Sequence, residues 1–199
     1  MNDQTPLSSS RRQEILDAAA AVFAQKGYHG TGMRDIAERL GMKAGSLYFH
    51  LASKDAALEE VCAAGLQSVL RAAEHAVGVA GDLNRRIRAL VESQVRDLKV
   101  HGDYISVFVH ERRQLTAQGQ KRLSEVTRKH SALLDRIFED ARAKGELADG
   151  IEPRAARYAM VGLLRNFTQL YVEGPIRDFD AVAAQATEIF LSGASSVRG

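Results

Sequence analysis

Apolar residues return every three to four positions along nearly the whole chain, which is the spacing of one face of an α-helix. Glycine and proline, the residues that most often end helices, stand between these periodic stretches. Alanine and leucine abound and only three prolines occur among 199 residues, so the composition also favours helices over strands. We therefore predict an all-α protein of about nine helices.

The periodic stretches divide into a short N-terminal region and a longer C-terminal one. Residues 1–9 are polar and are expected to form a disordered tail. Residues 10–54 hold three predicted helices: a first that ends near Lys26, a short second that stops at Gly41, and a short third around Leu47. The second and third are too short to be stable alone, so we expect them to pack on the first.

The longer region, residues 55–199, is expected to hold the remaining helices. Ser53 is the predicted N-cap of its first helix, Asp82 opens the next, and Pro153 suits a first turn because it lacks an amide hydrogen. A final helix is expected from about Asp178 to Ser195. The last two helices carry apolar residues on more than one face, which predicts burial against a second copy of the chain.

The net charge of +2 belongs to the N-terminal region. Seven lysines and arginines stand against five acidic residues up to Lys54, and the rest of the chain is balanced. A basic excess suits a partner that carries phosphates. The single Cys62 can form no internal disulfide, and the chain shows neither a signal peptide nor a run able to cross a bilayer. We expect a cytoplasmic protein with no membrane partner.

No arrangement of residues indicates catalysis. The six histidines include no H-E-x-x-H pair, because His110-Glu111 lacks the second histidine. Neither a phosphate-binding loop nor a nucleophile elbow occurs, and Cys62 lies in an apolar helical stripe. We therefore predict that the protein is not an enzyme, with no catalytic residues, no metal site and no cofactor.

The most informative segment runs from Gly27 to Leu58. It is typical of two short helices joined by a turn, the second of which opens in the small residues Ala44, Gly45 and Ser46. A helix in the major groove of DNA contacts base edges with its N-terminal part, and small residues allow a close approach. An ordinary helical hairpin with Tyr48 and Phe49 in its core is the alternative.

This segment resembles the DNA-binding domain of TetR-family repressors. The residues that match the family's spacing are Gly27, Tyr28, Thr31, Ile36, Ala37, Gly41, Met42, Gly45, Leu47, Tyr48, His50, Lys54 and Leu58. Two positions depart from the pattern: Lys43 stands where many relatives have Ser or Thr, so the helix cap must come from elsewhere, and Leu51 replaces the usual Phe. The C-terminal helices resemble the family only in number, order and dimer-like ending.

The resemblance implies a homodimer, joined through its last two helices, that binds a pseudo-palindromic, double-stranded operator and leaves it when a small-molecule inducer binds. It implies phosphate contacts from Thr31, Tyr48, His50 and Lys54, with Met33 and Arg34 near the backbone or the groove edge. The positions expected nearest the bases are Lys43, Ala44, Gly45, Ser46 and Phe49.

The inducer is expected among the C-terminal helices. Apolar candidates for its cavity are Val69, Leu98, Tyr104, Phe108, Leu134, Phe138, Leu163 and Phe167, each of which a simple core position explains at least as well. The helix order after Val107 resembles regulators that sense acyl-CoA thioesters. Arg112, Arg113 and Arg165 would then face the phosphates of coenzyme A, with ordinary surface ion pairs as the alternative.

The sequence thus predicts a repressor released by an acyl-CoA thioester or another hydrophobic metabolite. A DNA-binding activator, or an architectural protein without a ligand, is the alternative.

Overall fold

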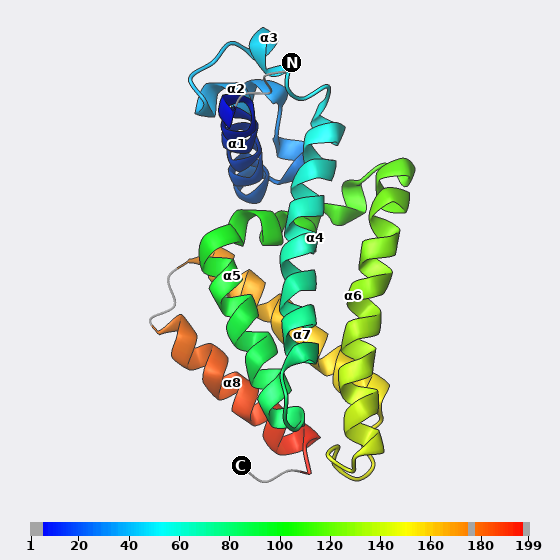
Figure 1. Ribbon diagram of the computed structural model, residues 1–199. Coiled ribbons are helices and arrows are strands. Elements are labelled where there is room, and N and C mark those ends of the chain that lie inside the picture. Colours follow the sequence, from blue (N-terminus) through cyan, green and yellow to red (C-terminus); the bar gives the residue numbers. More distant parts are fainter. Residues whose placement is uncertain (1–5, 175–177, 197–199) are drawn as a thin grey trace. The chain divides into compact units, whose positions relative to one another are not determined.

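The computed structural model describes residues 6–174 and 178–196, and the regular structure in these residues is helical apart from one isolated β-bridge between Leu147 and Ser195 (Figure 1). The prediction of an all-α fold is confirmed. In chain order the helices are α1 (Pro6–Gly30), α2 (Met33–Arg39), α3 (Ala44–Leu47), α4 (Lys54–Gly78), α5 (Leu83–Glu111), the 3₁₀ helix η1 (Arg112–Gln114), α6 (Ala117–Ala143), α7 (Pro153–Glu173) and α8 (Phe179–Ala194).

The chain forms two compact units. The N-terminal unit comprises the residues up to Gly65 together with Asp103–Leu123, and the C-terminal unit comprises Leu66–Gly102 together with the residues from Ser124 onward. The boundaries fall inside α4, α5 and α6 rather than in loops. The sequence, which places the division after Lys54, does not anticipate that the last part of α5, from Asp103 onward, belongs to the N-terminal unit.

The boundary within α5 coincides with a break in the helix. His101 has φ −126° and ψ 25°, which is outside the helical range, and Gly102 follows it. The sequence predicts two helices here, one that ends near Gly102 and one that contains Tyr104. The structure joins them into a single helix with one irregular turn.

The core of the N-terminal unit is built on α1, which contributes the fully buried side chains of Ile15, Ala19 and Phe23. The helix begins at Pro6, earlier than the sequence predicts, because proline is well tolerated in a first turn. Residues 6–9, which the sequence places in a disordered tail, are therefore helical, and residues 1–5 lie outside the described part.

Two glycines of this unit take left-handed backbone conformations that other residues rarely adopt. Gly27 breaks α1 with φ +68°, and Gly41 turns the chain between α2 and α3 with φ +63°. The amide of Met42 then donates to the carbonyl of Ala37 over 3.0 Å, which closes the end of α2. The predicted turn at Gly41 is confirmed.

Several predicted helix ends are also confirmed. The amide of Ala56 donates to the hydroxyl oxygen of Ser53 at the start of α4 over 3.1 Å. The amide of Arg85 donates to the carboxylate of Asp82 before α5 over 2.9 Å, and α7 begins at Pro153. None of the helices in the described residues is both long enough and apolar enough to span a bilayer.

Candidate functional site

The third helix is short, but its last turn continues beyond Leu47. The amides of His50 and Leu51 both donate to the carbonyl of Leu47 over 2.9 Å. Leu47 and Leu51 are buried, whereas the side chains of Tyr48 and Phe49 are 54% and 90% exposed. The helical hairpin with these two rings in a core, the alternative from the sequence, is therefore wrong.

The start of α3 is open. Lys43 precedes the helix in an extended conformation, and its side chain makes no capping hydrogen bond with the described residues. The side chains of Lys43 and Ser46 are exposed, and Ala44 is half-buried. A Cβ added to Gly45 would meet no described atom within 4 Å. The residues predicted nearest the bases thus lie at or near one exposed surface.

Thr31 and Lys54, predicted to contact phosphates, have partners inside the unit. Thr31 is 3% exposed and its hydroxyl donates to the carbonyl of Gly27 over 2.7 Å. The Lys54 ammonium donates to the carbonyls of Tyr28 and Thr31, each over 3.0 Å, and lies 4.2 Å from the centre of the Tyr28 ring. These bonds hold the turn between α1 and α2 against the start of α4. A phosphate contact from either residue stays a prediction.

Tyr28 also ties the turn between α1 and α2 to the start of α4, a structural role that the motif match does not reveal. Its hydroxyl donates to the carboxylate of Asp55, the residue after Lys54. This hydrogen bond, together with partial burial and the charge of Asp55, raises the pKa of Tyr28 to about 12. The phenol therefore stays protonated under ordinary conditions and keeps its bond to α4.

The first turn of α2 is held by Asp35. Its carboxylate accepts from the Lys26 ammonium over 2.5 Å and from the amide of Gly32 over 2.6 Å, and both bonds lower the pKa of Asp35. In the same turn Arg34 is exposed and Met33 is half-buried. Arg34 is therefore free of the core and accessible to a phosphate. His50 is likewise exposed at the end of α3.

Three residues predicted for the ligand cavity, Tyr104, Phe108 and Arg112, lie in the N-terminal unit. The Tyr104 hydroxyl donates to Asp17 of α1 over 2.7 Å and accepts from the Gln13 amide over 3.1 Å, and its pKa is raised by burial and by Asp17. The Arg112 guanidinium lies 5.4 Å from the centre of the Phe108 ring. Tyr104 is thus hydrogen-bonded to α1.

The other predicted ligand residues lie in the C-terminal unit. Arg165 is exposed and Leu163 is half-buried. The remaining residues are buried: Val69, Leu98, Leu134, Phe138 and Phe167. The rings of Phe138 and Phe167 pack edge-on against Phe190 and Phe179, each pair with centroids 6.3 Å apart. These contacts show core packing, and a cavity among these residues stays a prediction.

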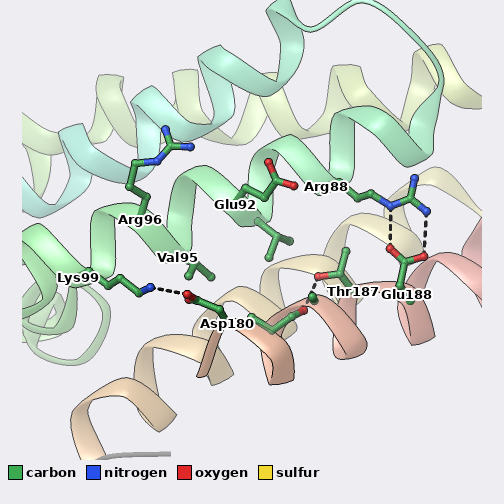
Figure 2. Close-up of a pocket in the computed structure, with 11 residues that line it drawn as sticks. Arg88, Glu92, Val95, Arg96, Lys99, Asp180, Thr187 and Glu188 are labelled. Carbon is green, nitrogen blue, oxygen red and sulfur yellow. Dashed lines mark hydrogen bonds and ion pairs between the residues drawn. The ribbon is translucent and has the colours of Figure 1, made fainter. Parts of the chain in front are cut away.

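A pocket of about 360 Å³ lies between α5 and α8 of the C-terminal unit (Figure 2). Its floor is apolar, and ion pairs link the two helices on either side of it, between Arg88 and Glu188 and between Lys99 and Asp180 (Figure 2). The Arg88 guanidinium lowers the pKa of Glu188. The apolar floor residues are Val91, Val95 and Ala183, and the buried Thr187 beside them donates its hydroxyl to the carbonyl of Ala183. None of the predicted ligand residues lines this pocket.

The described residues contain no cluster of three His, Cys, Asp or Glu side chains that could hold a metal ion. Cys62 is fully buried, and burial raises the pKa of its thiol to about 12. The thiol is therefore held in its unreactive, protonated form.

Two sequence families match the chain. The model described as "Bacterial regulatory proteins, tetR family" matches residues 15–61, and the model described as "Tetracyclin repressor-like, C-terminal domain" matches residues 80–194. The second match alone covers more than half of the chain.

Characterised relatives agree with these matches. The HTH-type transcriptional repressor KstR2 of Rhodococcus jostii (strain RHA1) is 28% identical over 195 residues, which is 98% of this chain and 96% of that protein. The HTH-type transcriptional activator FasR of Mycolicibacterium smegmatis is 30% identical over 163 residues, 77% of this chain and 67% of that protein. The crystal structure of AibR in complex with isovaleryl coenzyme A and operator DNA shares the fold, with a TM-score of 0.78, 21% identity, and coverage of 90% of this chain and 97% of that chain.

Proposed function

The chain belongs to the TetR family of bacterial regulatory proteins, and from this premise we propose that it acts as a homodimeric repressor that an inducer releases from a pseudo-palindromic operator. Its homologues are transcriptional regulators, and it is a DNA-binding regulator like them. Its site of action is the cytoplasm, where bacterial DNA lies.

The observation that carries this proposal is the exposed face of α3. Leu47 and Leu51 hold the helix in the N-terminal unit, while Lys43, Gly45 and Phe49 remain uncovered. A short helix anchored on one side and bare on the other suits insertion into a major groove. The exposed Tyr48, His50 and Arg34 would contact phosphates, while Thr31 and Lys54 support the surface from behind.

The dimer is proposed to form through α7 and α8. Each helix exposes a large apolar or aromatic side chain, Tyr158 at 54% and Ile189 at 74%. The exposed stripe of α7 also holds the small residues Ala155, Ala159 and Gly162, which permit close helix packing. Two-fold symmetry would place two copies of α3 on two half-sites of one duplex.

The inducer is proposed to be an acyl-CoA thioester or another hydrophobic metabolite bound in the C-terminal unit. AibR, which shares the fold, binds isovaleryl coenzyme A, and Arg165 here is exposed and available to a phosphate. Isovaleryl-CoA, coenzyme A and isovalerate are therefore the probes, and release of bound DNA is the readout. Release by the thioester alone is expected, with a weaker response in Arg165→Ala. If none of the three releases DNA, the ligand class is wrong while DNA binding stands.

Activation is the second candidate function, because the activator FasR is also a relative. Transcription in vitro from a promoter that contains the selected operator separates the two. Added protein is expected to lower the transcript yield, and a rise would identify an activator.

DNA binding is tested by selection from a random duplex pool with the full chain, followed by titration of the enriched duplex over a range of salt. Arg34→Ala is expected to weaken binding to all duplexes alike and to lower the salt slope by about one. Lys43→Ala is expected to change the preference among sequences. Arg71→Ala, which alters an exposed arginine of the C-terminal unit, is the control and should leave both the affinity and the sequence preference unchanged. Failure to enrich any sequence would contradict the proposal.

A further inference from the structure

Phe49 is the most exposed large apolar side chain among the described residues, at 90%. It is not left outside by local disorder of the helix, because the amides of His50 and Leu51 continue the hydrogen-bonding pattern from Leu47. Since successive helical residues are 100° apart, Phe49 points away from the buried side chains of Leu47 and Leu51. The phenyl ring is therefore held on the outer face of α3 by the two leucines that anchor the inner face.

Gly45 lies one helical turn before Phe49 on the same face. Its backbone is not in the left-handed region, and an added Cβ would meet no atom of the described chain within 4 Å. Neither conformation nor internal packing therefore requires a glycine here. The missing side chain leaves space in front of the ring for a surface that approaches from outside.

The chemistry of the major groove limits what a phenyl ring can recognise there. The ring has no hydrogen-bonding group, whereas guanine, cytosine and adenine present only donors and acceptors at their edges. Thymine alone adds an apolar group, the C5 methyl, which packs against apolar side chains. Lys43, an exposed residue that directly precedes the helix, has the complementary chemistry, because its ammonium suits the O6 and N7 acceptors of guanine.

We propose that Phe49 reads thymine: each operator half-site carries a thymine whose C5 methyl packs against the Phe49 ring. This inference rests on the proposed function of α3 as the DNA-reading element. It adds a chemical identity for one base of the operator and names the side chain that selects it.

The test removes the methyl from the DNA and the ring from the protein. The full chain selects a duplex from a random pool, and each thymine of that duplex is replaced in turn by deoxyuridine, which lacks the methyl but pairs identically. At one thymine in each half-site, the replacement is expected to weaken binding about fourfold, the contribution of one buried methyl group. Kd is measured by fluorescence anisotropy at a fixed salt concentration.

The protein variants complete the cycle. Phe49→Ala is expected to bind more weakly and to be indifferent to deoxyuridine at that position, while Phe49→Leu retains part of the discrimination. Arg71→Ala, at an exposed position of the C-terminal unit, is expected to keep the full deoxyuridine effect, and circular dichroism checks that each variant is folded. The inference is overturned if no thymine shows the effect, or if the effect persists unchanged in Phe49→Ala. Failure to enrich any duplex would instead contradict the proposed function, which is sequence-specific DNA binding.

Discussion

Tyr104, in the second half of α5, donates its hydroxyl proton to the carboxylate of Asp17 in α1 over 2.7 Å. The two residues are far apart in sequence but belong to the same compact unit. The last part of α5, from Asp103 onward, is thus hydrogen-bonded directly to α1.

Replacement of Tyr104 by Phe removes this bond and keeps the buried ring. We expect a loss of about 1 kcal/mol in the free energy of unfolding, the usual net value of one hydrogen bond. Amide hydrogen exchange in α1 near Asp17 should become faster. Tyr171→Phe, which removes a hydroxyl from the C-terminal unit, is the control and should leave exchange in α1 unchanged. Equal exchange in the wild type and Tyr104→Phe would show that the bond does not stabilise α1.

Gly65→Ala is expected to destabilise the protein. The added Cβ would overlap the backbone carbonyl of Tyr104 in α5, and backbone atoms cannot move aside as a flexible side chain can. Overpacking of this kind costs about 1–3 kcal/mol, more than the 0.5–1 kcal/mol or so that alanine gains over glycine in a helix. Urea denaturation measures the difference.

Gly193→Ala is the matched control for that substitution. Gly193 lies in the last turn of α8, and a Cβ there would meet no described atom within 4 Å. The control should be neutral or slightly stabilising. A neutral Gly65→Ala would mean that the two helices can separate without loss of stability.

Alkaline pH should weaken the hydrogen bond between the Tyr28 hydroxyl and the Asp55 carboxylate. The pKa of Tyr28 is raised from its ordinary value of 10.0 to about 12 in the folded protein, so folding favours the protonated phenol. The resulting stability is complete below about pH 10 and is lost as the pH rises through about 12. We expect a contribution of about 1 kcal/mol, because solvent screens a half-buried side chain.

The measurement compares the wild type with Tyr28→Phe. Thermal melts from neutral pH to about pH 12 should show that the variant is less stable than the wild type at neutral pH. The difference in stability between the two proteins should shrink as Tyr28 ionises. A difference that stays constant with pH would show that the phenol proton is not involved.

Ile189→Glu should convert the proposed dimer into monomers. Ile189 is 74% exposed in the single chain, so a charge there is harmless unless a partner covers it, in which case an unpaired charge is buried. Light scattering after size-exclusion chromatography gives the mass. Val100→Glu, at a 69% exposed position of α5, is the control and should remain dimeric. A dimeric Ile189→Glu would move the interface away from this face of α8.

The features that could be predicted from the sequence are those fixed by neighbours in the chain. Ser53 and Asp82 cap helices because their side chains reach the amide three residues ahead, and Gly41 turns the chain because glycine accepts a positive φ. The exposed α3 face follows from a motif whose spacing already separates Leu47 from Phe49.

The features that could not be predicted depend on which helices meet. Helical periodicity indicates that Tyr104 is buried but not that its neighbour is Asp17. In the same way, the motif gives the positions of Thr31 and Lys54 but not the inward direction of their polar atoms. The pocket between α5 and α8 has no local signal, because its walls come from opposite ends of the C-terminal unit's sequence.

The N-terminal unit is assembled from two separate stretches of sequence, and this limits how such a protein can be recombined. A chimera that took only the residues up to Gly65 would receive Asp17 without Tyr104 and Gly65 without the backbone it packs against. A chimera that exchanges the N-terminal unit between relatives must therefore replace both stretches, the residues up to Gly65 and Asp103–Leu123, together.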